Sequence, residues 1–246
     1  MSLLGRTLAD GDRLEVAGAV VRLKINRRAR RVSLRLDRMR GEIVATAPSA
    51  RRLAEAAAFA HDRAGWIAQR LAELPRGEGV TPGMTLPLFG EAVRLDLASG
   101  RARFVAATES DDALILAAGE GEAYVRAALR VIKAHALEVF TARTEHYAAA
   151  LGAVPPTVAV MDARSRWGSC KAPVGGKPAA VRYSWRLALA PFAVADYVAA
   201  HECAHLLEMN HSPAFWSHVS RLVGDPRPHR AWLRAEGARL HAFGRA

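Results

Sequence analysis

The stretch HECAHLLEMNH, residues 201–211, decides how the rest of this sequence is interpreted. Its first five residues have the pattern H-E-x-x-H, in which two histidines four positions apart project from one face of a helix and can bind the same ion. Zinc suits neutral imidazoles, and a catalytic zinc keeps three protein ligands and one open position. The sequence therefore predicts His201 and His205 as zinc ligands, with Glu202 placed where it can reach a metal-bound water.

Apolar residues surround the motif and indicate a helix, expected from Phe192 to Met209. A carboxylate inside such a run needs a reason, because an unpaired buried charge is costly. The alternative is a surface helix that happens to carry two histidines.

The third ligand is either Glu208 or His211. Glu208 falls on the same helical face, but at ~1.5 Å rise per residue it lies about 10 Å along the axis from His201, which favours a supporting role. Asn210 is a candidate left-handed C-cap, and Ser212-Pro213 reads as the start of a new helix. Such a turn would bring His211 back towards the ion, so His211 is the predicted third ligand.

Residues 201–216, HECAHLLEMNHSPAFW, resemble the YgjP-like metallopeptidases, relatives of the SprT and WLM zinc peptidases. The upstream segments RSRWGSC, residues 164–170, and WRL, residues 185–187, resemble the same family. The resemblance implies a zincin-like α+β fold, one Zn²⁺ per chain and Glu202 as catalytic base, with three histidine ligands. It also implies that an edge strand carrying Arg166, Trp167, Gly168 and Ser169 binds an extended substrate. The alternative for these residues is an ordinary hairpin strand with Trp167 in the core. The insertion 171–177 departs from the family pattern at the turn after this strand.

Length and composition are those of an ordinary globular chain. The 246 residues are 51% hydrophobic and 24% charged, which fits one large domain or two small ones. No apolar run is long enough for a membrane span and no signal peptide is visible, so a cytoplasmic protein is expected. Two cysteines, Cys170 and Cys203, do not make a disulfide framework.

The formal net charge of +11 comes mostly from arginine. Runs such as RRARR, residues 27–31, could contact the phosphates of a nucleic acid, or they could reflect an arginine-rich proteome. No aromatic residues interleave with these arginines, as a stacking surface would require.

Hydrophobic periodicity predicts an N-terminal part, residues 1–78, made of β-hairpins plus a helix and packed on a catalytic part, residues 79–246. The expected elements are strands at 14–16, 20–25, 32–36 and 43–47, a helix at 50–74, three strands within 86–97 and 101–117, a helix at 122–151, strands at 158–161, 166–170 and 180–185, and helices at 192–209, 213–223 and 226–243.

These observations favour a zinc metallopeptidase that acts on peptide or protein substrates, with Glu202 transferring the proton of a zinc-activated water to the leaving amine. One alternative is a basic nucleic-acid-associated protein with a structural zinc, in which Glu202 would be dispensable. Another is a metal hydrolase acting on a small amide. The oligomeric state is left open.

Overall fold

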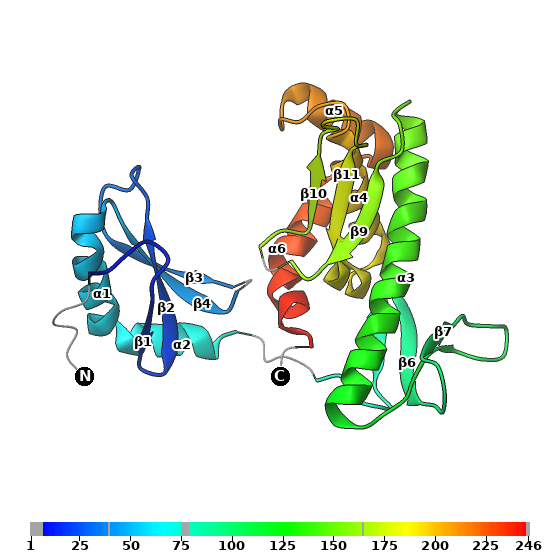
Figure 1. Ribbon diagram of the computed structural model, residues 1–246, viewed down its shortest axis with the longest axis horizontal. Helices are drawn as coiled ribbons and strands as arrows, with labels where there is room; N and C mark the ends of the chain where they lie inside the picture. The colour runs from blue at the N-terminus through cyan, green and yellow to red at the C-terminus, as the bar shows by residue number, and fades with distance from the viewer. Residues whose placement is uncertain (1–6, 39, 75–78, 164, 245–246) are drawn as a thin grey trace. The chain divides into compact units, whose positions relative to one another are not determined.

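The computed structural model describes residues 7–38, 40–74, 79–163 and 165–244 (Figure 1). Contacts divide the chain into two compact units, Met1–Arg76 and Gly77–Ala246, and each is described by itself. The described residues form small mixed sheets and helices, which confirms the predicted α+β class. The packing of the first unit on the second stays a prediction.

The first unit is a four-stranded sheet covered by helices. Its strands are β1 (Arg13–Val16), β2 (Ala19–Ile25), β3 (Ser33–Asp37) and β4 (Glu42–Ala47), in the spatial order β1-β2-β4-β3. Both predicted hairpins are confirmed, since β1–β2 and β3–β4 pair antiparallel, and a parallel β2–β4 pair joins them. Alternate residues of β2, among them Val21 and Leu23, are fully buried, so one face of the sheet forms the core.

The single helix predicted at 50–74 is wrong. The chain forms a 3-10 turn, η1 (Ala50–Arg52), followed by α1 (Leu53–Asp62) and α2 (Ala64–Ala72), with a break at Arg63. A straight helix of that length would span about 37 Å, whereas four strands are only ~15–20 Å wide. The break lets both helices bury residues against one small sheet, Leu53 from α1 and Ile67 from α2.

The second unit begins with another four-stranded sheet. Its strands are β5 (Thr85–Leu88), β6 (Glu91–Leu97), β7 (Arg103–Val105) and β8 (Ala113–Ala117). The sequence predicts three strands here, and that is wrong because the segment 86–97 folds back on itself as a hairpin. The turn is Phe89-Gly90, with φ of 51° and 91°, and two positive φ angles are the mark of the tight turns that fit twisted hairpins.

The two four-stranded sheets repeat one design. The second has the order β5-β6-β8-β7, with the same antiparallel, parallel, antiparallel pairing as the first. Gly11 N–H donates to Leu23 O at 2.9 Å, and Gly83 N–H donates to Leu95 O at 2.7 Å, at equivalent places. The sequences LEVAGAVVRLKI, residues 14–25, and LPLFGEAVRLDL, residues 86–97, align without a gap. The repeat was not predicted from the sequence, although five of these twelve aligned positions are identical.

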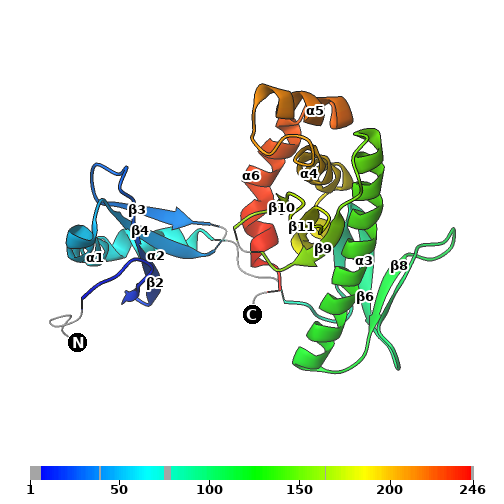
Figure 2. The ribbon, with the colours of Figure 1, turned by 45° about the horizontal axis from the view of Figure 1, so that its top comes forward.

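The long helix α3 (Gly121–Ala150) confirms the predicted helix at 122–151 and packs along both sheets of the second unit (Figure 1). The second of these sheets consists of β9 (Thr157–Met161), β10 (Gly168–Lys171) and β11 (Ala180–Ser184) in the order β10-β11-β9, so β10 is an edge strand. After β11 the chain forms η2 (Trp185–Leu189), α4 (Phe192–Ala204), α5 (Pro213–Val223) and α6 (Arg227–Ala242). The helix that carries the motif, α4, contacts α3, α5 and α6, and Figure 2 shows it between α3 and α6.

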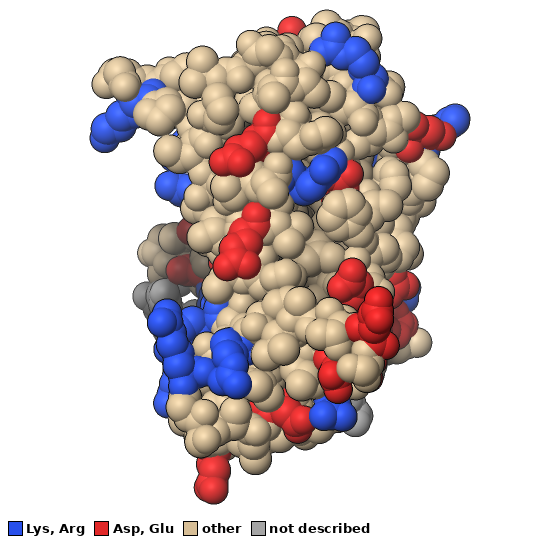
Figure 3. Space-filling model, turned by 90° about the vertical axis from the view of Figure 1, so that its right-hand side faces the viewer, with Lys and Arg blue, Asp and Glu red and all other residues tan. Residues whose placement is uncertain are grey.

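None of the helices in the described ranges is long and apolar enough to cross a membrane. On the face beside α3 and β7, most side chains are neutral, with a small basic group at the lower left of the view and a small acidic group at its lower right (Figure 3). This face therefore offers no broad surface of a single sign.

Candidate metal centre

Helix α4 brings His201 and Glu202 to its last turn and ends at Ala204, so the predicted end at Met209 is wrong. His205 is the C-cap residue, and Leu206 and Leu207 donate to Cys203 and Ala204 in tight turns. The early end of α4 lets the chain turn within a few residues. The predicted left-handed conformation of Asn210 is wrong, because the non-glycine residues with positive φ in the described ranges are Ala17 and Phe89.

Ser212 then starts α5 as predicted, because its hydroxyl accepts the backbone N–H of Phe215 at 3.2 Å. This capped helix start fixes the chain directly after His211. The turn between α4 and α5 is therefore short and anchored at both ends.

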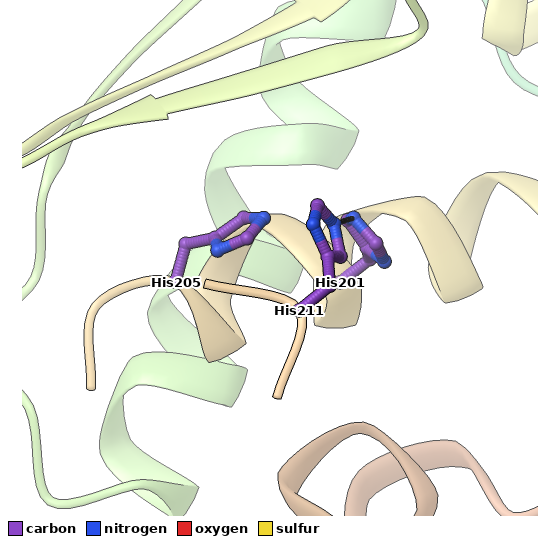
Figure 4. A group of neighbouring side chains, drawn as sticks. All are labelled: His201, His205 and His211. Carbon is purple, nitrogen blue, oxygen red and sulfur yellow. Dashed lines mark hydrogen bonds between the residues drawn. The ribbon is translucent and has the colours of Figure 1, made fainter. Parts of the chain in front are cut away.

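The imidazoles of His201, His205 and His211 converge at this turn (Figure 4). One nitrogen from each ring lies within 4.8 Å of the other two, and Nε2 of His211 is 3.1 Å from Nε2 of His201. Tetrahedral zinc ligands at 2.0–2.1 Å from the metal lie about 3.3 Å from each other. The described residues therefore contain a set of three nitrogen donors that can hold one metal ion.

The second nitrogen of each motif histidine faces a group of the protein. Nδ1 of His205 is 3.0 Å from the backbone oxygen of Glu208, and Nδ1 of His201 is 3.5 Å from the hydroxyl of Tyr197. A carbonyl can only accept, so it favours the tautomer with the proton on Nδ1 of His205 and leaves Nε2 free for a metal. The contact of Glu208 with His205 is therefore made by its backbone oxygen and not by its carboxylate.

The site favours neutral imidazoles. Burial, followed by the charges of His205, His211 and Arg230, lowers the pKa of His201 to about 3. Burial also lowers the pKa of His205. Metal ligands must be deprotonated, so these shifts suit metal binding near neutral pH.

Two aromatic side chains of α5 pack on the triad. The ring of Phe215, which is fully buried, lies 4.9, 4.5 and 4.7 Å from the rings of His201, His205 and His211. The ring of Trp216 lies 5.8 Å from His201 and 5.9 Å from His211. The Phe-Trp pair therefore forms an apolar wall that restricts the orientations of the imidazoles.

Glu202 is 6% exposed, and burial raises its pKa to about 7, an effect opposed by the charge of Arg166. Its side chain lies against β10. A Cβ added to Gly168 would lie 2.6 Å from Cδ of Glu202, closer than any real contact. Glycine at this position therefore lets the edge strand approach the carboxylate.

The four residues predicted to bind substrate lie at or just before this edge strand. Gly168 and Ser169 begin β10, whereas Arg166 and Trp167 precede it, which corrects the predicted strand start at Arg166. Trp167 is half-buried and its ring packs 4.3 Å from that of His241 on α6. Arg164, the first residue of the family-like segment, lies outside the described residues.

Two features of this site were not predicted from the sequence, namely the contact of Gly168 with Glu202 and the packing of Phe215 on the imidazoles. Gly168 and Phe215 both belong to segments that resemble the family, but these two contacts were not predicted for them. His135 on α3 stacks on Phe104 at 4.2 Å and does not join the triad.

An H-E-x-x-H helix joined by a third imidazole from the following turn is a site of the metallopeptidase class. The model of the family described as YgjP-like, metallopeptidase domain, matches residues 30–236, and the chain belongs to this family. This confirms the predicted family, and the family implies peptide or protein substrates. Comparison with curated proteins and with solved structures gave no match.

Proposed function

We propose that this chain is a zinc-dependent peptidase in which His201, His205 and His211 hold the metal and Glu202 is the general base. The observation that carries the proposal is the convergence of three imidazole nitrogens within 4.8 Å beside a buried carboxylate. Neutral imidazole donors suit zinc, and no fourth His, Cys, Asp or Glu in the described ranges joins the group. Three protein ligands are the number typical of a catalytic zinc.

When bound, zinc supplies Lewis acidity, which polarises a carbonyl oxygen and makes water more acidic. Glu202 accepts a proton from the attacking water and delivers it to the nitrogen of the leaving amine. A carboxyl group with a pKa of about 7 is suited to both steps, because efficient acid–base groups titrate near the working pH.

The substrate is placed by β10. Among the residues that the structure describes, this strand pairs with β11 alone, so its other edge has no strand partner there. Gly168 has no side chain, so an extended peptide on this edge can approach Glu202 closely. Hydrogen bonds to the backbone would align many sequences equally well, which predicts weak side-chain selectivity along this strand.

The substitution Glu202→Gln tests the proposal because it removes the proton acceptor and keeps the shape of the side chain. We expect unchanged zinc content and at least an equal melting temperature, with turnover of an unfolded protein such as casein reduced by about 10²–10⁴-fold. Zinc is measured by mass spectrometry and turnover by release of peptides. Turnover within a factor of about two of wild type would contradict the role of Glu202 and favour a structural metal.

A further inference from the structure

Positive charge is concentrated in the first unit. Residues 1–76 contain 16 of the 35 Lys and Arg and 8 of the 24 Asp and Glu, so this unit has a formal net charge of +8 out of +11. The second unit is more than twice as long and has only +3. A charge excess of this kind attracts polyanions to the first unit.

Much of the excess lies in the loop between β2 and β3. Arg27, Arg28, Arg30 and Arg31 are exposed there. Elsewhere in the unit, Arg22, Arg52 and Arg70 pair with glutamates. Within the described residues, none of the four loop arginines has a carboxylate within ion-pair distance, so their charges are available to a ligand.

A groove of about 450 Å³ adjoins this loop and is partly aromatic. One wall is the start of the edge strand β3, and the other is formed where α1 breaks and α2 begins. Phe59 and Trp66 are both half-buried there, and the guanidinium of Arg63 lies 5.6 Å from the ring centre of Phe59. The residues that line the groove are Arg31, Val32, Ser33, Leu34, Phe59, Arg63 and Trp66.

The break at Arg63 produces this arrangement. In the sequence, Phe59 and Trp66 are about 30 residues from the arginine run, and no aromatic residue lies within the run. The fold places both rings beside Arg31 and adds Arg63 between them. The arginine run itself has no aromatic rings, and α1 and α2 supply them from elsewhere in the sequence.

We propose that this groove binds single-stranded nucleic acid, with a base stacked on Trp66 or Phe59 and phosphates held by Arg31, Arg63 and the loop arginines. Proteins that bind single strands combine a basic groove with aromatic rings on which bases stack. A duplex keeps its bases stacked inside and cannot offer them to these rings. The site is independent of the metal centre, so it does not rest on the proposed peptidase activity.

The test uses the full-length protein and a fluorescently labelled 15-nucleotide oligo-dT, with binding followed by anisotropy at 50–200 mM salt. We expect Trp66→Ala to weaken binding by about 5- to 150-fold, the usual range for loss of one stacking ring, and Trp66→Phe to retain most of the affinity. The double variant Arg31→Ala/Arg63→Ala should weaken binding and reduce the slope of log K against log salt by about 0.7 for each lost phosphate contact.

Arg52→Ala is the matched control, because it removes one positive charge from the same unit at a residue that pairs with Glu55 outside the groove. It should leave the salt slope unchanged. Each variant is also checked for an unchanged circular dichroism spectrum and melting transition. If Trp66→Ala is unfolded, the quenching of tryptophan fluorescence by oligo-dT in wild type, and its reduction in Trp66→Phe, tests the same stacking.

Four results would overturn the proposal. The first is the absence of oligo-dT binding at 50 mM salt, and the second is an equal loss of affinity in Arg52→Ala and in the Arg31→Ala/Arg63→Ala variant. The third is duplex binding as tight as single-strand binding, with no effect of Trp66→Ala. The fourth is displacement of the oligonucleotide by a poly-glutamate peptide at a lower concentration than unlabelled oligo-dT requires. The last result would identify the groove as a docking site for an acidic protein segment.

Discussion

The close approach of Gly168 to Glu202 yields the sharpest prediction. In Gly168→Ala the new Cβ would lie 2.6 Å from both Cγ and Cδ of Glu202, and ordinary contacts begin at 3.4 Å. The carboxylate or the strand must therefore move by about 0.8 Å. Overpacking of this kind costs about 1–3 kcal/mol of stability, and a displacement near 1 Å at a catalytic group can reduce the rate ~100-fold.

The three atoms nearest to the added Cβ all belong to the Glu202 side chain beyond its own Cβ. A double-mutant cycle with Glu202→Ala therefore isolates the contact. Gly168→Ala should be costly in the wild-type background and nearly neutral in the Glu202→Ala background, with a coupling energy of about 1–3 kcal/mol. Stability is measured by urea unfolding, and turnover by casein cleavage.

Gly65→Ala serves as the control, because Gly65 lies within α2, its φ is not in the left-handed region, and an added Cβ meets no atom within 4 Å. It should stabilise the protein by about 0.5–1 kcal/mol and leave turnover unchanged. Equal costs of Gly168→Ala in both backgrounds, or full activity with no loss of stability, would refute the proposed steric role of Gly168.

The remaining predictions concern the metal and the pH. His201→Ala or His205→Ala should abolish stoichiometric zinc and lower the melting temperature, because a metal that binds only the folded state stabilises it; one zinc per chain in both variants would contradict the assignment. In a chelator competition, His211→Ala should weaken zinc binding strongly. Glu208→Ala should weaken it only slightly, because Glu208 contacts His205 through its backbone oxygen. The reverse order would show that His211 is not the third ligand. In metal-free protein the pKa of Glu202 is raised from 4.5 to about 7, so its contribution to stability is full below pH 4.5 and is lost as the pH rises through 7. Glu202→Gln should therefore gain stability over wild type across this range, by up to roughly 3 kcal/mol, and urea unfolding at pH 4.5 and pH 8 that gave one constant difference would contradict the shift.

The sequence alone determined the parts of this protein that depend on near neighbours in the chain. The four-residue spacing in H-E-x-x-H puts His201 and His205 on one helical face, and the Ser212-Pro213 pair specifies the start of α5. The apolar spacing of residues 122–151 predicts α3 almost to the residue. These features follow from backbone geometry and capping, which act within one or two helical turns.

Only the tertiary structure decided the features that depend on packing between distant segments. The end of α4 at Ala204, which allows His211 to meet the motif histidines, replaces a helix that periodicity alone would extend to Met209. The break at Arg63 carries no proline signal and arises because two short helices cover a narrow sheet better than one long helix. The approach of Gly168 to Glu202 joins residues 34 positions apart. Spacing and capping signals act only between near neighbours in the chain, so they do not specify these features.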